Sequence, residues 1–102
     1  MNESDAAKAF SALGNEKRIE VFRLLVQAGR DGLNVGEIQA LLGVPASTLA
    51  HHIAALVKAG LVTQEKQGRE VTCRAAYESL ESVIAFMTDQ CCAGVKVLDK
   101  TA

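Results

Sequence analysis

Two adjacent cysteines, Cys91 and Cys92, are the residues whose types and spacing offer this chain its clearest chemistry. A vicinal dithiol can chelate a thiophilic ion, undergo oxidation, or fill space as a small apolar pair. Only one other cysteine, Cys73, occurs among the 102 residues. The chain opens on acidic residues and carries no secretory signal pattern, which predicts a cytoplasmic protein. In that reducing compartment, an odd number of cysteines favours thiols or metal ligands over a disulfide framework.

The composition predicts one mainly α-helical domain over residues 1–102. Hydrophobic residues make up 49% of the chain and aromatic residues only 4%, so the core must consist of Leu, Val, Ile and Ala, which favours packed helices. No apolar run reaches the length of a membrane span, so no membrane partner is expected. The net charge of -1 excludes a globally basic nucleic-acid binder. Any nucleic-acid contact must therefore rest on a local patch, and residues 43–74 carry four cations against two carboxylates.

Hydrophobic periodicity and capping signals predict five helices and one β-hairpin. The helices are expected over residues 5–13, 16–28, 35–42, 46–59 and 77–92, and the strands over 61–66 and 69–75. Asn15 is the expected N-cap of the second helix, and Asn34 forms a capping box with Glu37 ahead of the third. The element order α-α-α-α-β-β-α, with a tight turn before the fourth helix, is that of a winged helix-turn-helix.

Two segments carry a more specific resemblance. Residues 12–25 read ALGNEKRIEVFRLL, and residues 42–62 read LGVPASTLAHHIAALVKAGLV. Both are similar to motifs of the ArsR–SmtB family of bacterial metal- and metalloid-responsive repressors. The resemblance implies a homodimer that binds double-stranded operator DNA and leaves it when an inducer binds. Ala50 departs from the pattern, because the family commonly has a serine at that position.

The predicted DNA-binding residues lie on the fourth helix and on the hairpin. They are Ser47, Thr48, His51 and His52 on the helix, and Lys66 and Arg69 beside the hairpin turn. The first three lie away from the apolar stripe of their helix, where short polar side chains can reach the major groove. His51 is the expected DNA contact of the histidine pair, and His52 is expected to be partly structural. The two hairpin cations are placed to contact phosphates or the minor groove.

The first and last helices, over residues 5–13 and 77–92, carry apolar stripes beyond what the central helices need for packing. Such unused apolar surface fits a dimer interface, as the family resemblance also implies. Two-fold symmetry would then present two recognition helices to a palindromic site.

The last predicted helix carries Cys91 on its apolar stripe and Cys92 off it. Successive helical side chains diverge by roughly 100°, so the two thiols can converge only where the helix ends, which the nearby Gly94 permits. Some ArsR-type repressors carry a similar terminal Cys-Cys pair followed by Gly and respond to trivalent arsenic. The resemblance therefore implies trivalent arsenic or antimony as the inducer, with no organic cofactor.

Cys73 is the one thiol available as a third ligand, although its place on the apolar side of the second strand also suits a packing role. Three thiolates suit arsenite or antimonite. Two suit a monosubstituted organoarsenical such as methylarsenite, whose organic group occupies the third position on arsenic. The sequence leaves both forms open.

Three other functions compete with this interpretation. A thiol redox or persulfide-sensing repressor of the same fold ranks second, because relatives of that type pair a last-helix cysteine with one on the second helix, where this chain has none. A thiol oxidoreductase or metallochaperone lacks its Cys-x-x-Cys motif and a nearby base, so no enzyme activity is expected. A protein-binding winged helix would carry an apolar patch in place of the polar recognition residues.

Overall fold

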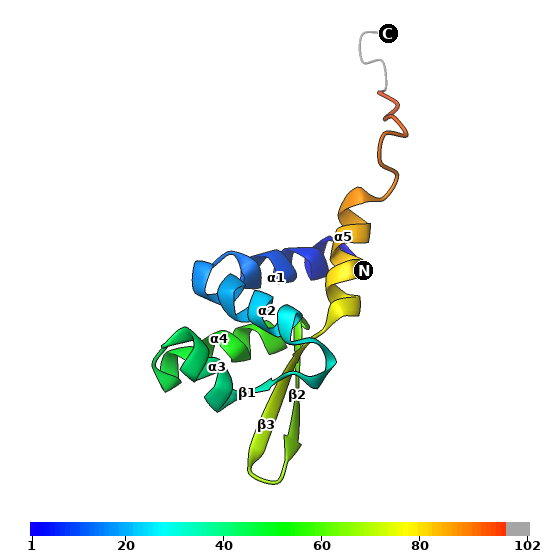
Figure 1. Ribbon diagram of the computed structural model, residues 1–102. Coiled ribbons are helices and arrows are strands. Elements are labelled where there is room, and N and C mark those ends of the chain that lie inside the picture. The colour runs from blue at the N-terminus through cyan, green and yellow to red at the C-terminus, as the bar shows by residue number, and fades with distance from the viewer. Residues whose placement is uncertain (98–102) are drawn as a thin grey trace.

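The computed structural model describes residues 1–97 and consists of five α-helices and a small three-stranded antiparallel sheet (Figure 1). The elements are α1 Glu3–Leu13, α2 Glu16–Ala28, the 3₁₀ turn η1 Gly29–Asp31, β1 Leu33–Asn34, α3 Val35–Leu42, α4 Ala46–Lys58, β2 Val62–Gln67, β3 Glu70–Ala75 and α5 Tyr77–Thr88. This order confirms the predicted winged helix-turn-helix. It adds a short strand, β1, that the sequence did not reveal.

Asparagine side chains fix the starts of the first two helices. The side chain of Asn2 accepts a hydrogen bond from the backbone N–H of Asp5 at 2.9 Å, and α1 therefore begins two residues earlier than predicted. The side chain of Asn15 accepts from the N–H groups of Lys17 and Arg18, which confirms the N-cap expected for α2.

The helix-turn-helix unit is α3 followed by α4. The predicted capping box is present, since Asn34 accepts from the N–H of Glu37 at 2.8 Å and the Glu37 carboxylate accepts from the N–H of Asn34 at 2.9 Å. Gly43 ends α3 at φ 64°, a left-handed conformation that glycine adopts without strain. Within residues 1–97 no single helix is long and apolar enough to span a bilayer, and α3 and α4 reach that composition only together, across a bend of 116°.

The sheet has the order β1-β3-β2, so β3 is its central strand. β2 and β3 form the predicted hairpin, and Leu33 of β1 pairs with Cys73 on the other side of β3. This pairing requires Gly32. Its φ is 67°, and a Cβ at this position would overlap the carbonyl oxygen of Cys73, so the chain can approach β3 only with glycine here.

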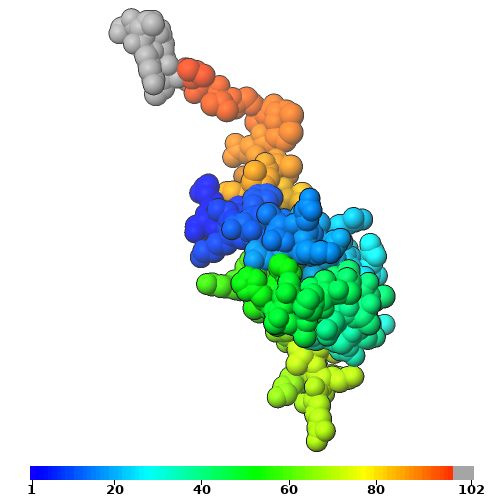
Figure 2. All heavy atoms as spheres, turned by 90° about the vertical axis from the view of Figure 1, so that its left-hand side faces the viewer, coloured from blue at the N-terminus to red at the C-terminus, as the bar shows by residue number. Residues whose placement is uncertain are grey.

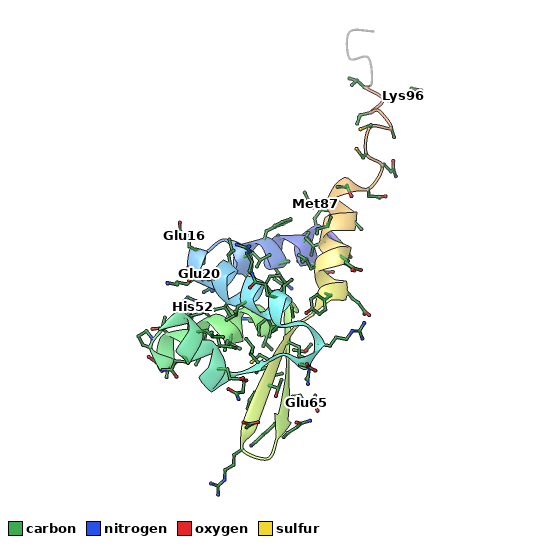
Figure 3. The ribbon with its side chains drawn as sticks, in the orientation of Figure 1. Glu16, Glu20, His52, Glu65, Met87 and Lys96 are labelled. Carbon is green, nitrogen blue, oxygen red and sulfur yellow. The ribbon has the colours of Figure 1, made fainter. Side chains whose placement is uncertain are left out.

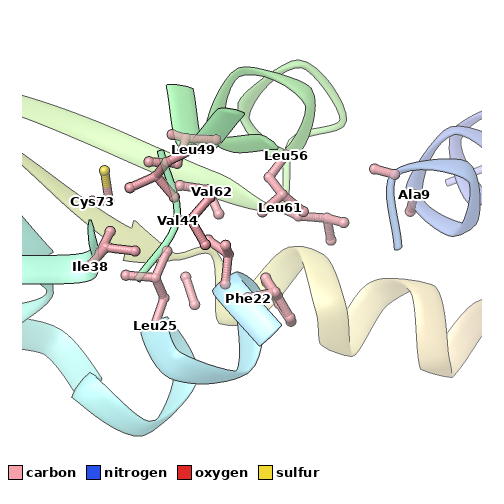
Figure 4. Packing of buried hydrophobic residues seen from close by; sticks show 14 of the residues in the cluster. Ala9, Phe22, Leu25, Ile38, Val44, Leu49, Leu56, Leu61, Val62 and Cys73 are labelled. Atoms are coloured by element: carbon pink, nitrogen blue, oxygen red, sulfur yellow. The ribbon is translucent and has the colours of Figure 1, made fainter. Parts of the chain in front are cut away.

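The core lies between α2, α4 and β3, with α1, α3 and α5 closing its sides (Figure 4). Its fully buried side chains are Val21, Leu25, Ile38, Leu49, Leu56, Leu61 and Cys73. Burial of each leucine stabilises the fold by about 1.5–3 kcal/mol. This packing fixes α4 against α2, and the other side of α4 remains exposed.

The last helix is shorter than predicted. α5 ends at Thr88 rather than near Cys92, and Gln90 and Cys92 adopt positive φ values of 57° and 64°. Helices gain most of their stability from packing, and the last turns of α5 have little to pack on within one chain, since Met87 is 59% exposed. The chain beyond α5 therefore leaves the body as an arm (Figures 1 and 2).

Candidate nucleic-acid interface and thiol site

The exposed side of α4 carries three of the predicted DNA-binding residues, Ser47, Thr48 and His51. The opposite side is buried through Leu49 and Leu56, which set the rotation of the helix relative to the core. Pro45 precedes α4 and provides no side-chain cap. The first N–H groups of α4 therefore have no capping side chain and can bind an anion such as a backbone phosphate.

His52 differs from its neighbour His51, because it is only 8% exposed and lies toward α2 (Figure 3). Its Nδ1 accepts a hydrogen bond from Nε of Arg18 at 3.4 Å, and the same guanidinium lies 3.5 Å from Nε2 of His51. Burial, and then the Arg18 cation, lower the pKa of His52. The structure therefore places His52 between α2 and α4, away from the exposed surface on which Ser47, Thr48 and His51 lie.

The sequence does not indicate Arg18 as a site residue. It lies at the start of α2, and its two histidine partners are 33 and 34 residues further along the chain. No local pattern indicates such a contact. Only a correct packing of α2 on α4 would have revealed it.

The hairpin carries Lys66 at the end of β2 and Arg69 in the turn, and both side chains are exposed. The wing projects from the body on the same side as the α3–α4 unit (Figure 1). Arg74 braces its base, since it donates to Glu65 at 2.8 Å and to the carbonyl oxygen of Arg30 at 2.7 Å. These contacts tie the base of the hairpin to η1.

The thiol pair lies just beyond α5. The Cys91 N–H donates to the carbonyl oxygen of Thr88 at 2.9 Å, and the left-handed Cys92 turns the chain so that the two Sγ atoms are 2.8 Å apart. Both residues are exposed. Cys91 therefore lies outside α5, and the two thiols converge beyond the end of the helix. Contact with Cys92 raises the pKa of the Cys91 thiol.

Cys73 is fully buried on β3, among the core residues of Figure 4. Burial raises the pKa of its thiol, against a contact with the Gln64 amide at 3.6 Å that lowers it. β3 and the arm beyond α5 lie in different parts of the molecule (Figure 1). Over residues 1–97, no three His, Cys, Asp or Glu side chains come together as a metal site. The structure thus brings Cys91 and Cys92 together and leaves Cys73 apart.

Comparison with known proteins identifies the family. A helix-turn-helix domain family matches residues 13–65. An ArsR-like transcriptional regulator from Rhodococcus sp. RHA1 superimposes with a TM-score of 0.75 at 31% identity, over 88% of this chain and 81% of that chain. This chain belongs to the ArsR family of winged helix-turn-helix proteins.

Two other comparisons show the range of the relatives. A Halobacterium salinarum protein, whose name assigns it as the repressor of an arsenical resistance operon, is 44% identical over 59 residues, which are 58% of this chain and 45% of that protein. HlyU from Vibrio cholerae superimposes with a TM-score of 0.69 at 26% identity over 90% of this chain and 99% of its own. HlyU is named a transcriptional activator. The chain spans about half the length of the first curated relatives it matches.

Proposed function

We propose that this ArsR-family protein is a transcriptional repressor that binds operator DNA as a homodimer and leaves it when trivalent arsenic binds Cys91 and Cys92. The observation that carries the DNA-binding part is the polar, exposed face of α4 with Ser47, Thr48 and His51 opposite its buried side. A helix of this kind, set on a rigid core, enters the major groove with its N-terminal residues toward the bases.

The contacts to DNA divide by chemistry. Ser47, Thr48 and His51 read base edges or adjacent phosphates from α4, and the open N-terminus of α4 favours a phosphate. Lys66 and Arg69 contact phosphates or the minor groove from the wing. Since the net charge of the chain is -1, the electrostatic part of the affinity must come from local cations such as these.

The dimer would form through α1 and α5, which lie against each other at one end of the molecule (Figure 1). Large apolar side chains remain exposed on these two helices within the single chain, namely Phe10 at 47%, Ile84 at 55% and Met87 at 59%. Contiguous exposed apolar surface marks an interaction site. A second copy that covers α5 would also give its last turns the packing partner that they lack.

Two thiols without a third favour an organoarsenical with one organic group. Such a compound, R–As(OH)₂, would exchange both hydroxyl groups for sulfur. Two As–O bonds break and two As–S bonds form, and the two thiol protons leave with the hydroxyl groups as water. Arsenic stays trivalent throughout. Methylarsenite is therefore the proposed inducer, since inorganic arsenite would keep one exchangeable position that the buried Cys73 does not reach.

Release requires that the arsenical bind one arrangement of the helices better than the other, with a coupling free energy of about 1–3 kcal/mol. Hydrogen bonds that join α5 to α2 and α2 to α4 could transmit such a change from the thiol pair to the DNA-binding helix. Tyr77 at the start of α5 donates to the carbonyl oxygens of Leu25 and Val26 at the end of α2. At the other end of α2, Arg18 contacts His51 and His52. A shift of α5 would thereby reach α4 through α2.

A second candidate is release by oxidation, which the exposure of both sulfur atoms favours. A peroxide would take two electrons and two protons from the thiols, leaving a disulfide and water. This candidate ranks lower, because α2 has no cysteine to pair with one at the end of α5.

An electrophoretic mobility shift with the DNA upstream of the protein's own gene tests the proposal. Titration with methylarsenite, arsenite, antimonite and hydrogen peroxide in turn is expected to give release at the lowest concentration with methylarsenite. The variants Cys91→Ser and Cys92→Ser should bind DNA as the parent does and ignore methylarsenite, whereas Cys73→Ala should respond fully. DNA binding that every one of these reagents leaves intact would contradict the inducer, and release by peroxide alone would favour the redox candidate.

A further inference from the structure

A cavity of about 400 Å³ lies between α1, the start of α2 and the end of α4. Three cations from these three helices line it, namely Lys8, Arg18 and Lys58. Its remaining walls are mostly alanine side chains, and no carboxylate lines it. We refer to the three cations as the α1–α4 cation patch. Helices α1 and α4 pack against each other, and both lie on the face shown in Figure 2.

The charges of the patch are only partly neutralised by neighbours. Among residues 1–97 the ion pairs are Lys17–Glu20 and Arg74–Glu65, so neither Lys8 nor Lys58 pairs with a carboxylate there. Asp5 lines the adjoining cavity together with both lysines. The three cations of the patch and this one carboxylate together carry a net charge of +2. Like charges held together on a folded surface repel one another, and an anion bound between them relieves this repulsion.

The position of Lys58 on α4 indicates which anion. Lys58 follows His51 by seven residues and Ser47 by eleven, so all three lie on one face of the helix. At 1.5 Å per residue, Lys58 lies roughly 16 Å beyond Ser47 along the axis. The major groove is about 12 Å wide. With the start of α4 in the groove, Lys58 falls past its edge, where the sugar-phosphate backbone runs.

The patch is also clear of the proposed dimer interface. Lys8 and Phe10 are two residues apart on α1, so their side chains point about 200° apart around the helix. A second copy that covers Phe10 would leave Lys8 open to DNA.

We call the face of α4 that carries Ser47, His51 and Lys58 the reading face. We propose that the α1–α4 cation patch binds a backbone phosphate of the operator, at the C-terminal end of the reading face, whereas Ser47 lies at its N-terminal end. This inference rests on the proposed DNA-binding function. Lys8 and Lys58 act as direct phosphate contacts, and α1 thereby joins α4 and the wing as a DNA-binding element. Arg18 lines the same cavity and keeps His51 and His52 in place. A phosphate contact fixes register and adds affinity without reading sequence.

Fluorescence anisotropy with the full chain tests this, with labelled operator and an unrelated duplex measured from 50 to 200 mM salt. Lys8→Gln and Lys58→Gln should each reduce the slope of log Kd against log salt by about 2, because the dimer loses one phosphate contact in each protomer, and should weaken both duplexes alike. Lys58→Arg should keep the parent slope. Lys96→Gln makes the same charge change on the arm and should also keep it. Because the lysines are exposed, thermal unfolding should be unaffected.

If the parent chain binds operator DNA and both glutamine variants retain its salt slope, the patch does not contact phosphate, although the proposed function stands. Retained slopes combined with a loss of thermal stabilisation by inorganic phosphate in Lys58→Gln would assign the patch to a free anion, which also overturns the inference. Failure of the parent chain to bind any duplex would instead overturn the proposed function.

Discussion

Nε of Arg18 lies 3.4 Å from Nδ1 of His52, and this contact joins α2 to the inward side of α4. The acceptor nitrogen must be unprotonated, so the contact exists only with a neutral imidazole. His52 thus holds the recognition helix in place, whereas its neighbour His51 stands exposed on the reading face.

The stability of the fold should depend on pH through His52. Its pKa is lowered in the folded chain by burial and by Arg18, so the unfolded chain, with a histidine pKa near 6.5, binds the proton more readily. The contribution of the neutral His52 to the free energy of unfolding is complete above pH 6.5. It is lost as the pH falls from there toward the lowered pKa of His52 in the folded chain. Urea unfolding at pH 7.5 and 5.5 should show a smaller pH effect in His52→Gln than in the parent. An equal effect in both proteins would contradict this.

The proposed dimer face should tolerate charge poorly. Phe10→Glu and Met87→Glu introduce a charge into surface that the partner would cover, and both positions are about half exposed in the single chain. Sedimentation at micromolar concentration should therefore show folded monomers, with a dissociation constant raised at least tenfold. Leu41→Glu is the matched control, because this leucine is 63% exposed but lies on α3. Monomers in the parent chain itself would contradict the dimer.

The wing should contribute charge rather than sequence reading. Arg69 is exposed in the hairpin turn, so Arg69→Ala should weaken binding to operator and unrelated DNA alike and reduce the salt slope by about 2, one contact for each protomer of the dimer. Arg69→Lys keeps the charge and should keep the slope. A salt titration in which the alanine variant matches the parent would remove the wing from the interface.

The elements with strong local signals were predictable from the sequence, and those set by distant packing were not. Asn15 and the Asn34–Glu37 box lie within four residues of the groups that they cap, so the starts of α2 and α3 were read correctly. The pairing of β1 with β3 joins residues about 40 apart through a two-residue strand, which leaves no alternation to detect. The sequence predicts too late an end for α5, because its apolar stripe continues in the sequence where the single chain provides no surface to pack on.

The same distinction applies to the candidate sites. The adjacent thiols and the polar face of α4 are local patterns, and the structure keeps both exposed. The sequence allows Cys73 as a third thiol ligand of arsenic, because it does not give the distance between β3 and the end of α5. The residues of the α1–α4 cation patch come from three helices that are separate in the chain, so no sequence motif predicts the patch.

Cys73 should matter to stability and not to the arsenical response. Its side chain is fully buried, so Cys73→Ala leaves a small cavity and should lower the free energy of unfolding by about 1 kcal/mol. Release from DNA by methylarsenite should be unchanged in concentration dependence. Urea unfolding and the mobility shift measure the two effects separately. A loss of response in a variant that remains folded would make Cys73 a ligand after all.

Tyr77 should transmit the state of the thiol pair to the recognition helix. Its hydroxyl donates to the carbonyl oxygen of Val26 at 3.2 Å, which ties the start of α5 to the end of α2. Tyr77→Phe removes this contact, so stability should fall by about 1 kcal/mol and the ratio of DNA affinities without and with methylarsenite should fall severalfold. Thr88→Val is the control, because the Thr88 hydroxyl donates to the carbonyl oxygens of Ile84 and Ala85 in its own helix. An undiminished ratio in Tyr77→Phe would exclude the route through α2.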